Sequence, residues 1–364
     1  MPKIGLLVGR EESFPRAFLD ALNDLDRDDL QADMLKLGGT RMDELCAYDV
    51  IVDRISHDVP YFRLALKQAA LSGTRIVNNP YWCSADDKFL GYSLAHRLGL
   101  AVPRTVLLPN KQYGEDVSDE SLSNLEYPID WEGHLEWVGL PAYLKPAIGG
   151  GWRGVNRVDS IEELLHHYDR SGRDTMVLQQ AVEFDRYVRC FCFGRKDVVV
   201  CRYDPEARAY LPLEDEWLDK KLLRRIERDS VTICEALGYD CNTVEFAIAD
   251  GIPWAIDFTN IAPDMEIWSI TPEYFDRVVH GMVRLVERLA DQPGRVPHPR
   301  WEDLLTGPGT PKKRAKRTAA KKRSTSKTSS NAKGSAKTSN AGKKKASKKP
   351  TKRKTIGKTR KAAE

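Results

Sequence analysis

Two lysines and a glycine-rich loop form the first group of residues that could do chemistry. Lys88 stands where a helix is expected to begin, and Lys145 lies in a short apolar run followed at once by residues 148–154, IGGGWRG. Glycine lets the backbone amides of a loop approach phosphate oxygens, and lysine adds positive charge beside them. The pattern predicts a phosphate-binding site, with a plain flexible loop between surface lysines as the alternative. The predicted residues are Lys88, Lys145, Gly149, Gly150, Gly151 and Gly154.

A second group comes at the end of an apolar run. The segment Gln179, Gln180, Ala181, Val182 and Glu183 could present a backbone amide and a carbonyl to the edge of an adenine ring. An ordinary strand end is the other interpretation. Next to a phosphate site, the segment favours nucleotide binding.

Three oxygen-bearing side chains make up a third group. Glu245, Asp257 and Asn260 are ligands of the kind that magnesium prefers when it is held jointly with substrate phosphates. Each acid stands between two apolar residues, which favours a lined cleft over a pair of solvated charges at a hairpin end. We therefore predict a magnesium site here, with manganese as a second candidate cation.

The turn between the two acids decides whether they share a face of the sheet. Residues 243–248 and 252–258 are expected to form a hairpin. A two-residue turn, Asp250-Gly251, would pair residue 245 with residue 256 and separate the acids, whereas a three-residue loop over 249–251 pairs 245 with 255. The second arrangement makes the acids diagonal neighbours within reach of one cation. We predict the three-residue loop.

The elements that would position these groups fall into two parts. The first 80 residues alternate strand-like and amphipathic runs, which is typical of βαβ units around a parallel sheet. Neither the dinucleotide-binding nor the Walker-type glycine motif occurs there. Strands, capped helices and hairpins follow in the later part. Ser84 is expected to begin the helix that carries Lys88, and residues 109–140 are expected to be irregular. The predicted strands are 3–8, 32–37, 49–53, 75–77, 101–108, 143–146, 155–158, 176–180, 187–193, 198–203, 243–248 and 252–258.

Composition excludes several classes of protein. The chain has no apolar stretch of the length that spans a membrane and no signal-peptide layout at its start, so we expect neither a membrane protein nor a secreted one. Its seven cysteines form no C-x-x-C pair and are odd in number. This pattern suits buried thiols in a reducing cytoplasm better than a disulfide framework.

The net charge of +4 conceals two unlike parts. Residues 310–364 hold 22 of the 57 basic residues and a single acid, which leaves the first 309 residues with a net charge of −17. A segment so rich in Lys, Ser and Thr buries too little apolar surface to fold, so we expect a disordered tail. Nucleic acid, bound non-specifically through this tail, is the favoured partner. Such binding would localise the protein to the nucleoid. Other acidic partners, self-association or a merely solubilising role are the alternatives.

Together the motifs resemble those of the ATP-grasp superfamily, in its glutathione-synthetase-like branch that includes ligases adding glutamate to ribosomal proteins. The resemblance covers about residues 76–290. It rests on Asn79-Pro80 with Asp87-Lys88, on Leu144-Lys145-Pro146 with the glycines, on residues 189–194 and on residues 257–263. It implies an ATP-grasp domain over residues 81–300 and a small α/β domain over 1–80 before it, and the disordered tail predicted from composition takes up residues 301–364.

The resemblance also implies roles for residues. ATP would lie between two α+β subdomains, with the two lysines and the loop on its phosphates, Gln179 to Val182 along its adenine, and the three oxygen ligands on magnesium. Arg189 matches a family arginine that faces the reacting carboxylate or acyl phosphate, and Arg202 is a weaker candidate for the same anion.

Two positions depart from the family pattern. The family's ribose-binding acid stands two residues before Arg189, where this chain has Tyr187, so either Glu183 or Asp185 replaces it or the ribose contact is lost. The family's last metal motif is commonly acid-x-Asn, whereas Asp257 and Asn260 are separated by two residues.

The implied activity is an ATP-dependent ligase, ADP-forming, that joins a small-molecule or peptide carboxylate to an amine or thiol through an acyl phosphate. A nucleic-acid-associated protein with a nucleotide-binding body that does not ligate is one alternative. An ATP-dependent kinase is another.

Overall fold

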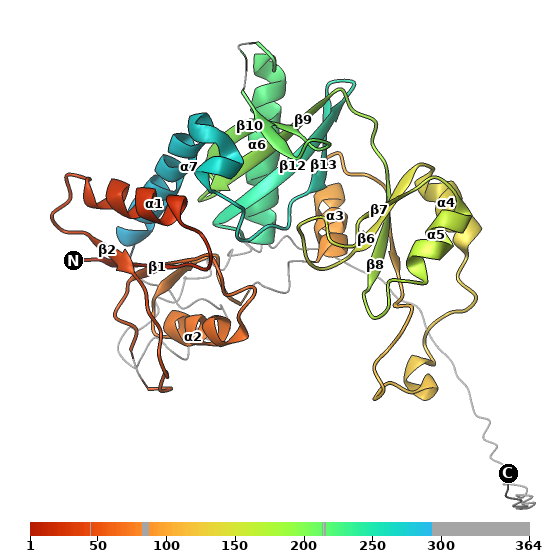
Figure 1. Cartoon of the computed structure of the whole chain (residues 1–364), viewed down its shortest axis with the longest axis horizontal. Helices are drawn as coiled ribbons and strands as arrows, with labels where there is room; N and C mark the ends of the chain where they lie inside the picture. Colours follow the sequence, from red (N-terminus) through yellow and green to blue (C-terminus); the bar gives the residue numbers. More distant parts are fainter. Residues whose placement is uncertain (44, 82–86, 213, 215, 293–364) are drawn as a thin grey trace, which may run out of the picture. The chain divides into compact units, whose positions relative to one another are not determined.

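The computed structural model of the chain describes residues 1–43, 45–81, 87–212, 214 and 216–292 (Figure 1). These residues belong to the compact unit Met1–Thr310. Ser84, Cys83 and the predicted tail over 301–364 lie outside them. Within the described ranges, no helix combines the length and apolar character that crossing a membrane would require.

The first 80 residues form the predicted parallel sheet. Its strands have the order β2-β1-β3-β4, and every neighbouring pair is parallel. Phe14 and Phe18 of the first helix are fully buried, because an apolar stripe at helical spacing packs onto the sheet. The elements are β1 (Lys3–Leu7), α1 (Ser13–Asn23), β2 (Gln31–Met34), β3 (Val50–Asp53), α2 (Pro60–Leu71) and β4 (Arg75–Val77).

A second sheet follows, antiparallel, with the order β5-β8-β6-β7. Helices α4 and α5 pack with it through one apolar cluster (Figure 1). As predicted, Ser160 caps α5, since its hydroxyl accepts the N–H of Glu163 at 3.2 Å. The elements are α3 (Lys88–Arg97), β5 (Thr105–Leu108), a 3-10 turn (Asp119–Leu122), α4 (Trp131–Val138), β6 (Ala142–Pro146), β7 (Asn156–Val158), α5 (Ile161–Tyr168) and β8 (Met176–Gln180).

A third sheet, with the order β11-β10-β9-β12-β13, is antiparallel and carries a helix on each face. Side chains alternate along β9, so Cys190 and Cys192 face α6, whereas Phe191 and Phe193 face α7. Gly238 ends α6 in the left-handed conformation, as predicted. The elements are β9 (Arg186–Phe193), β10 (Asp197–Asp204), β11 (Ala209–Leu211), α6 (Lys220–Leu237), β12 (Cys241–Ala249), β13 (Ile252–Asp257) and α7 (Ile267–Ala290).

Helix α7 joins the first and third sheets in one core. Its buried face shares a cluster with β1, α1 and β9, and Figure 1 shows α7 beside α1. Glu266 fixes the start of α1, since its carboxylate accepts the N–H groups of Glu12 and Ser13, both at 2.9 Å. The predicted sequence boundary near residue 80 therefore does not separate two hydrophobic cores.

Asn78 is the second tie between these sheets. Its Nδ2 donates to the carbonyls of Cys241 at 2.7 Å and Ile261 at 3.0 Å. Its Oδ1 accepts the N–H groups of Asp240 at 2.7 Å and Cys241 at 2.8 Å. Each hydrogen-bonding group of this side chain is thus engaged by backbone of the third sheet or of the segment after it.

The β12–β13 hairpin contradicts the predicted three-residue loop. Ala249 pairs with Ile252, so the turn is the two-residue Asp250-Gly251, with φ values of 52° and 71°. Two positive φ angles are those of a type I′ turn, whose twist matches that of the flanking strands. A bulge at Ile256 then restores the pairing of Glu245 with Asp257. The acids lie on one face, as expected, through a bulge and not through the loop.

Candidate active site

Lys145 is buried at the centre of the second sheet. Its Nζ donates to the hydroxyl of Tyr92 at 2.8 Å and to the carbonyl of Ile256 at 3.3 Å. Burial lowers the pKa of Lys145 to about 8, although the Asp257 carboxylate opposes this shift; the charge of Lys88 adds to it. With this pKa, the Lys145 ammonium can gain or lose its proton near neutral pH. It lies near the two acids of the third sheet.

Lys88 begins α3 and contacts the glycine loop. Asp87, not Ser84, caps the helix, because its carboxylate accepts the N–H of Leu90 at 2.6 Å. The N–H of Lys88 donates to the carbonyl of Ala147 at 2.8 Å, and its Nζ donates to the carbonyl of Gly149. The structure thus brings the two lysines and the start of the loop together.

The loop of residues 148–154 is exposed and turns in conformations that need glycine. Gly149, Gly151 and Gly154 have φ values of 96°, 70° and 68°. A Cβ on Gly154 would lie 3.0 Å from the Pro146 side chain, whereas Gly150 has open space around it. Trp152, also at positive φ, lies under the guanidinium of Arg208, 5.4 Å from the ring centroid. Arg208 belongs to the turn between β10 and β11, so the loop contacts the third sheet.

Glu245 is held by two residues of the neighbouring strand β9. Arg189 donates to Oε1 through Nε at 2.8 Å and also through Nη2, and the hydroxyl of Tyr187 donates to Oε2. Burial alone would lower the pKa of Arg189, but the Glu245 carboxylate more than offsets it, so the pKa is raised. The guanidinium also lies 4.3 Å from the ring centroid of Tyr203. Arg189 therefore stays charged on this face of the sheet.

Asp257 completes the pair of acids on the same face. It lies directly across from Glu245, and its carboxylate makes no hydrogen bond or ion pair with any residue that the structure describes. Asn260 follows, with its N–H bonded to Oδ1 of Asn242 at 3.0 Å, and its carboxamide is bonded to neither acid within that same part of the chain. Two carboxylates in register, with a carboxamide three residues on, are a donor set that fits a hard divalent cation held jointly with phosphates.

The predicted adenine segment lies at the end of β8. Gln179 is buried and its Nε2 donates to Thr105 at 2.9 Å, while Oε1 of Gln180 accepts from Arg104 at 3.3 Å. The N–H of Ala181 donates to the Pro141 carbonyl at 3.1 Å. That amide is engaged within the protein, so it is not available to a base.

Val182, Glu183 and Asp185 continue from β8 toward β9. Val182 packs beside the Tyr187 and Tyr203 rings, and Glu183 is exposed. Asp185 is exposed and lies 3.3 Å from Nε of Arg186. Neither acid makes a hydrogen bond or ion pair with Glu245.

Arg202 does not join this group. Arg202 lies on β10 and pairs with Val188 of β9, so it points to the face opposite Arg189. There its guanidinium lies 5.0 Å from the Trp217 ring centroid and 3.1 Å from Glu214. The expectation that Arg202 approaches the same anion as Arg189 is wrong in this structure. The reason is the strand period, which separates odd and even positions of paired strands.

Sequence reasoning missed Tyr92 and the holding role of Tyr187. Tyr92 bonds the bulged Ile256 carbonyl and Lys145. It stands four residues after Lys88, and this spacing places two side chains on one helix face, so the sequence could have predicted that Tyr92 lies near Lys88. The contact between Tyr187 and Glu245 depends on strand register and had no local signal.

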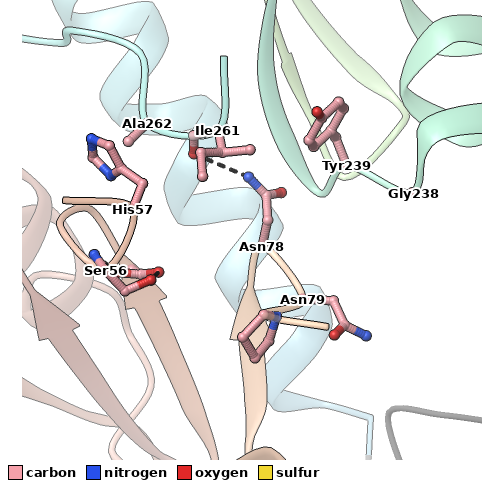
Figure 2. Close-up of a pocket in the computed structure, with 10 residues that line it drawn as sticks. Ser56, His57, Asn78, Asn79, Gly238, Tyr239, Ile261 and Ala262 are labelled. Carbon is pink, nitrogen blue, oxygen red and sulfur yellow. Dashed lines mark hydrogen bonds between the residues drawn. The ribbon is translucent and has the colours of Figure 1, made fainter. Parts of the chain in front are cut away.

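A small pocket lies beside Asn78, away from the lysines (Figure 2). Its volume is about 20 Å³, which is room for one water molecule. Figure 2 shows Asn78 reaching toward Ile261, so the tie between the sheets lines the pocket. It is too small to hold a substrate. The lining residues are Asp53, Ser56, His57, Asn78, Asn79, Pro80, Gly238, Tyr239, Ile261 and Ala262.

Comparison with known sequences gives a partial match. No known protein-family model matches the chain. Mitochondrial pyruvate carboxylase of Homo sapiens is 28% identical over 129 residues, which cover 30% of this chain and 11% of that protein. The chain thus corresponds to a small part of the relative's length.

Solved structures match over most of the chain. The D-alanine–D-alanine ligase of Bacillus anthracis, complexed with ATP, is 16% identical with a TM-score of 0.53, over 81% of this chain and 100% of that one. The RimK domain ATP-grasp protein of Sphaerobacter thermophilus is 16% identical with a TM-score of 0.56, over 78% and 98%. The ATP-grasp ligase PsnB, with precursor, Mg and ADP, is 13% identical with a TM-score of 0.51, over 79% and 98%. At these identities the matches show the fold alone, and the chain has the ATP-grasp fold of these structures.

Proposed function

We propose that the protein is an ATP- and magnesium-dependent ligase that joins a carboxylate to an amine or thiol through an acyl phosphate. One observation carries the proposal: Lys145 of the second sheet donates to the backbone carbonyl of Ile256, the bulged residue that precedes Asp257 in the third sheet. Two lysines near two carboxylates support a site for phosphates and a cation. Structures of similar fold include a D-alanine–D-alanine ligase and the ATP-grasp ligase PsnB in complex with a precursor peptide, which supports a small-molecule or peptide substrate.

In this proposal, basic residues would bind the phosphates and the reacting carboxylate, and an acid would bind the ribose. Lys88 and Lys145 would bind the phosphates, and the loop with Trp152 would cover them and exclude water, which otherwise hydrolyses an acyl phosphate. Arg189 would hold the carboxylate anion that attacks the terminal phosphate. Glu183 or Asp185 would bind the ribose, and the strand end at Gln179, Gln180 and Val182 would border the adenine.

Glu245 and Asp257, with Asn260, would hold magnesium or manganese. When bound, the cation supplies charge neutralisation for the transferring phosphoryl group. The acids can do this without a large rearrangement of the backbone, because the bulge already sets them opposite each other.

The decisive experiment incubates the full-length protein with ATP and MgCl₂ and pools of amino acids, small carboxylates and peptides. Release of ADP and phosphate is measured together with the mass of new products. ADP release that requires both an acid and an amine or thiol supports the ligase. A phosphorylated product with no added amine would identify a kinase instead, and ATP binding without turnover in any pool would favour the non-ligating body.

A matched pair of variants links turnover to the site. Asp257→Asn should abolish ADP release, whereas Asp250→Asn, at the exposed turn of the same hairpin, should keep it. Equal activity of the two variants would remove the acid pair from the mechanism.

We also propose that residues 310–364 bind nucleic acid non-specifically, which would bring a cytoplasmic enzyme to the nucleoid. Their 22 basic residues and single acid support this assignment. Binding of duplex DNA should fall steeply between 50 and 200 mM salt, with a slope near −0.9 per phosphate contacted. Protein ending at residue 309, which carries a net charge of −17, should not bind. Equal DNA binding by both proteins would refute the role of the tail.

A further inference from the structure

Tyr187 makes a contact that the proposed phosphoryl chemistry does not use. Its ring is buried on β9, packed between Phe184 and Tyr203 with centroids at 5.4 and 5.9 Å. Its hydroxyl donates to Oε2 of Glu245. A buried phenol needs such a partner, but here the partner is one of the two acids in the site.

The two oxygens of Glu245 differ in their remaining capacity. A carboxylate oxygen can accept two hydrogen bonds. Oε1 receives both from Arg189, whereas Oε2 receives one, from Tyr187. Oε2 is therefore the oxygen that keeps a lone pair for another positive partner, and the carboxylate is fixed at both ends.

We propose that Tyr187 is a positioning residue that orients the Glu245 carboxylate and leaves Oε2 to ligate the divalent cation shared with Asp257. The inference deepens the proposed function, because it presumes that the two acids bind a cation. Groups that hydrogen-bond to ligating carboxylates commonly change metal affinity by about 10- to 100-fold when they are removed.

Packing sets the direction of the phenol hydroxyl, which donates its hydrogen to Glu245. Ring packing on both sides leaves the hydroxyl one direction, toward β12.

The test measures how much Mn²⁺ improves the affinity of the full-length protein for ADP. Kd is determined by calorimetry in EDTA and again at saturating MnCl₂, and the ratio of the two values is the readout. Tyr187→Phe should lower this ratio about tenfold, with the EDTA value unchanged. Tyr203→Phe is the matched control. The Tyr203 ring lies on the same face of the sheet as Tyr187 and contacts the Arg189 guanidinium, but its hydroxyl does not bond Glu245. In this variant the ratio should stay within about twofold of wild type.

Glu245→Gln separates failure of this inference from failure of the proposed function. If Glu245→Gln lowers the ratio and Tyr187→Phe does not, the acid binds metal and Tyr187 does not position it, which overturns the inference alone. If Glu245→Gln leaves the ratio unchanged, the metal assignment itself is wrong. A loss of EDTA-state ADP affinity in Tyr187→Phe would show a general disturbance of the site and would also count against the inference.

Discussion

Lys145 should lower the free energy of unfolding at neutral pH, because its position in the site buries a charged ammonium group. The drop of its pKa from 10.5 to about 8 corresponds to about 3 kcal/mol at pH values where the lysine is charged in both the folded and the unfolded chain. Lys145→Met removes the charge and keeps much of the volume. The Ile256 carbonyl keeps its bond from Tyr92, and the Tyr92 hydroxyl still donates although it loses the bond that it accepts from Lys145. The variant should be more stable at pH 7 by about 2–3 kcal/mol, and it should lose ADP binding.

The pH dependence distinguishes this reasoning from simple repacking. Because the folded-state pKa is lowered, the unfolded chain binds more protons between pH 8 and 10.5, and wild-type stability gains up to about 1.4 kcal/mol per pH unit there relative to the variant. The advantage of Lys145→Met should therefore shrink between pH 8 and pH 9.5. Urea unfolding at pH 7, 8 and 9.5 measures it for both proteins. A variant that is less stable than wild type at pH 7, or a difference that does not change with pH, would refute the argument.

Three further outcomes follow from contacts described above. Lys88→Met, which removes a charged donor near the loop, should weaken ADP binding about 10- to 100-fold by calorimetry, and unchanged affinity would remove Lys88 from the phosphate site. Gly154→Ala should destabilise the protein by about 1–2 kcal/mol in thermal unfolding because of its positive φ and the nearby Pro146, whereas Gly150→Ala should be close to neutral; equal effects would contradict the backbone argument. Asn78→Ala, which loses four hydrogen bonds to backbone, should cost about 2–4 kcal/mol in urea unfolding, and a loss below about 1 kcal/mol would show that the tie is dispensable.

Patterns local to one segment were predictable from the sequence. The alternation in the first 80 residues predicted the parallel sheet, and the Ser160 and Gly238 caps were placed correctly, because these signals depend on neighbours a few residues away. Helix α4 was missed, since it is short and Gly133 and His134 interrupt its apolar positions. Helix α7 was not predicted either, although its buried face is long.

The positions of the site residues could not be fully predicted, because they depend on the register of the paired strands. The two-residue turn alone would have separated Glu245 from Asp257, and the bulge that reunites them follows from pairing along the whole hairpin and has no motif of its own. Arg202 was misplaced for the same reason, because one residue of register exchanges the faces of a strand. The lysines and acids were chosen by residue type, and the structure gathers Lys88, Lys145, Glu245, Asp257 and Arg189.

The core shared by α1 and α7 sets an order for folding during synthesis. Phe14 and Phe18 are among the first residues to leave the ribosome. The α7 residues that cover this side of the first sheet include Val278 and Met282, and they are synthesised only after more than two hundred further residues. At about 5–20 residues per second the delay is on the order of tens of seconds. The nascent chain would carry an incomplete apolar surface for that time, so its early half is a natural substrate for chaperones that bind exposed hydrophobic segments.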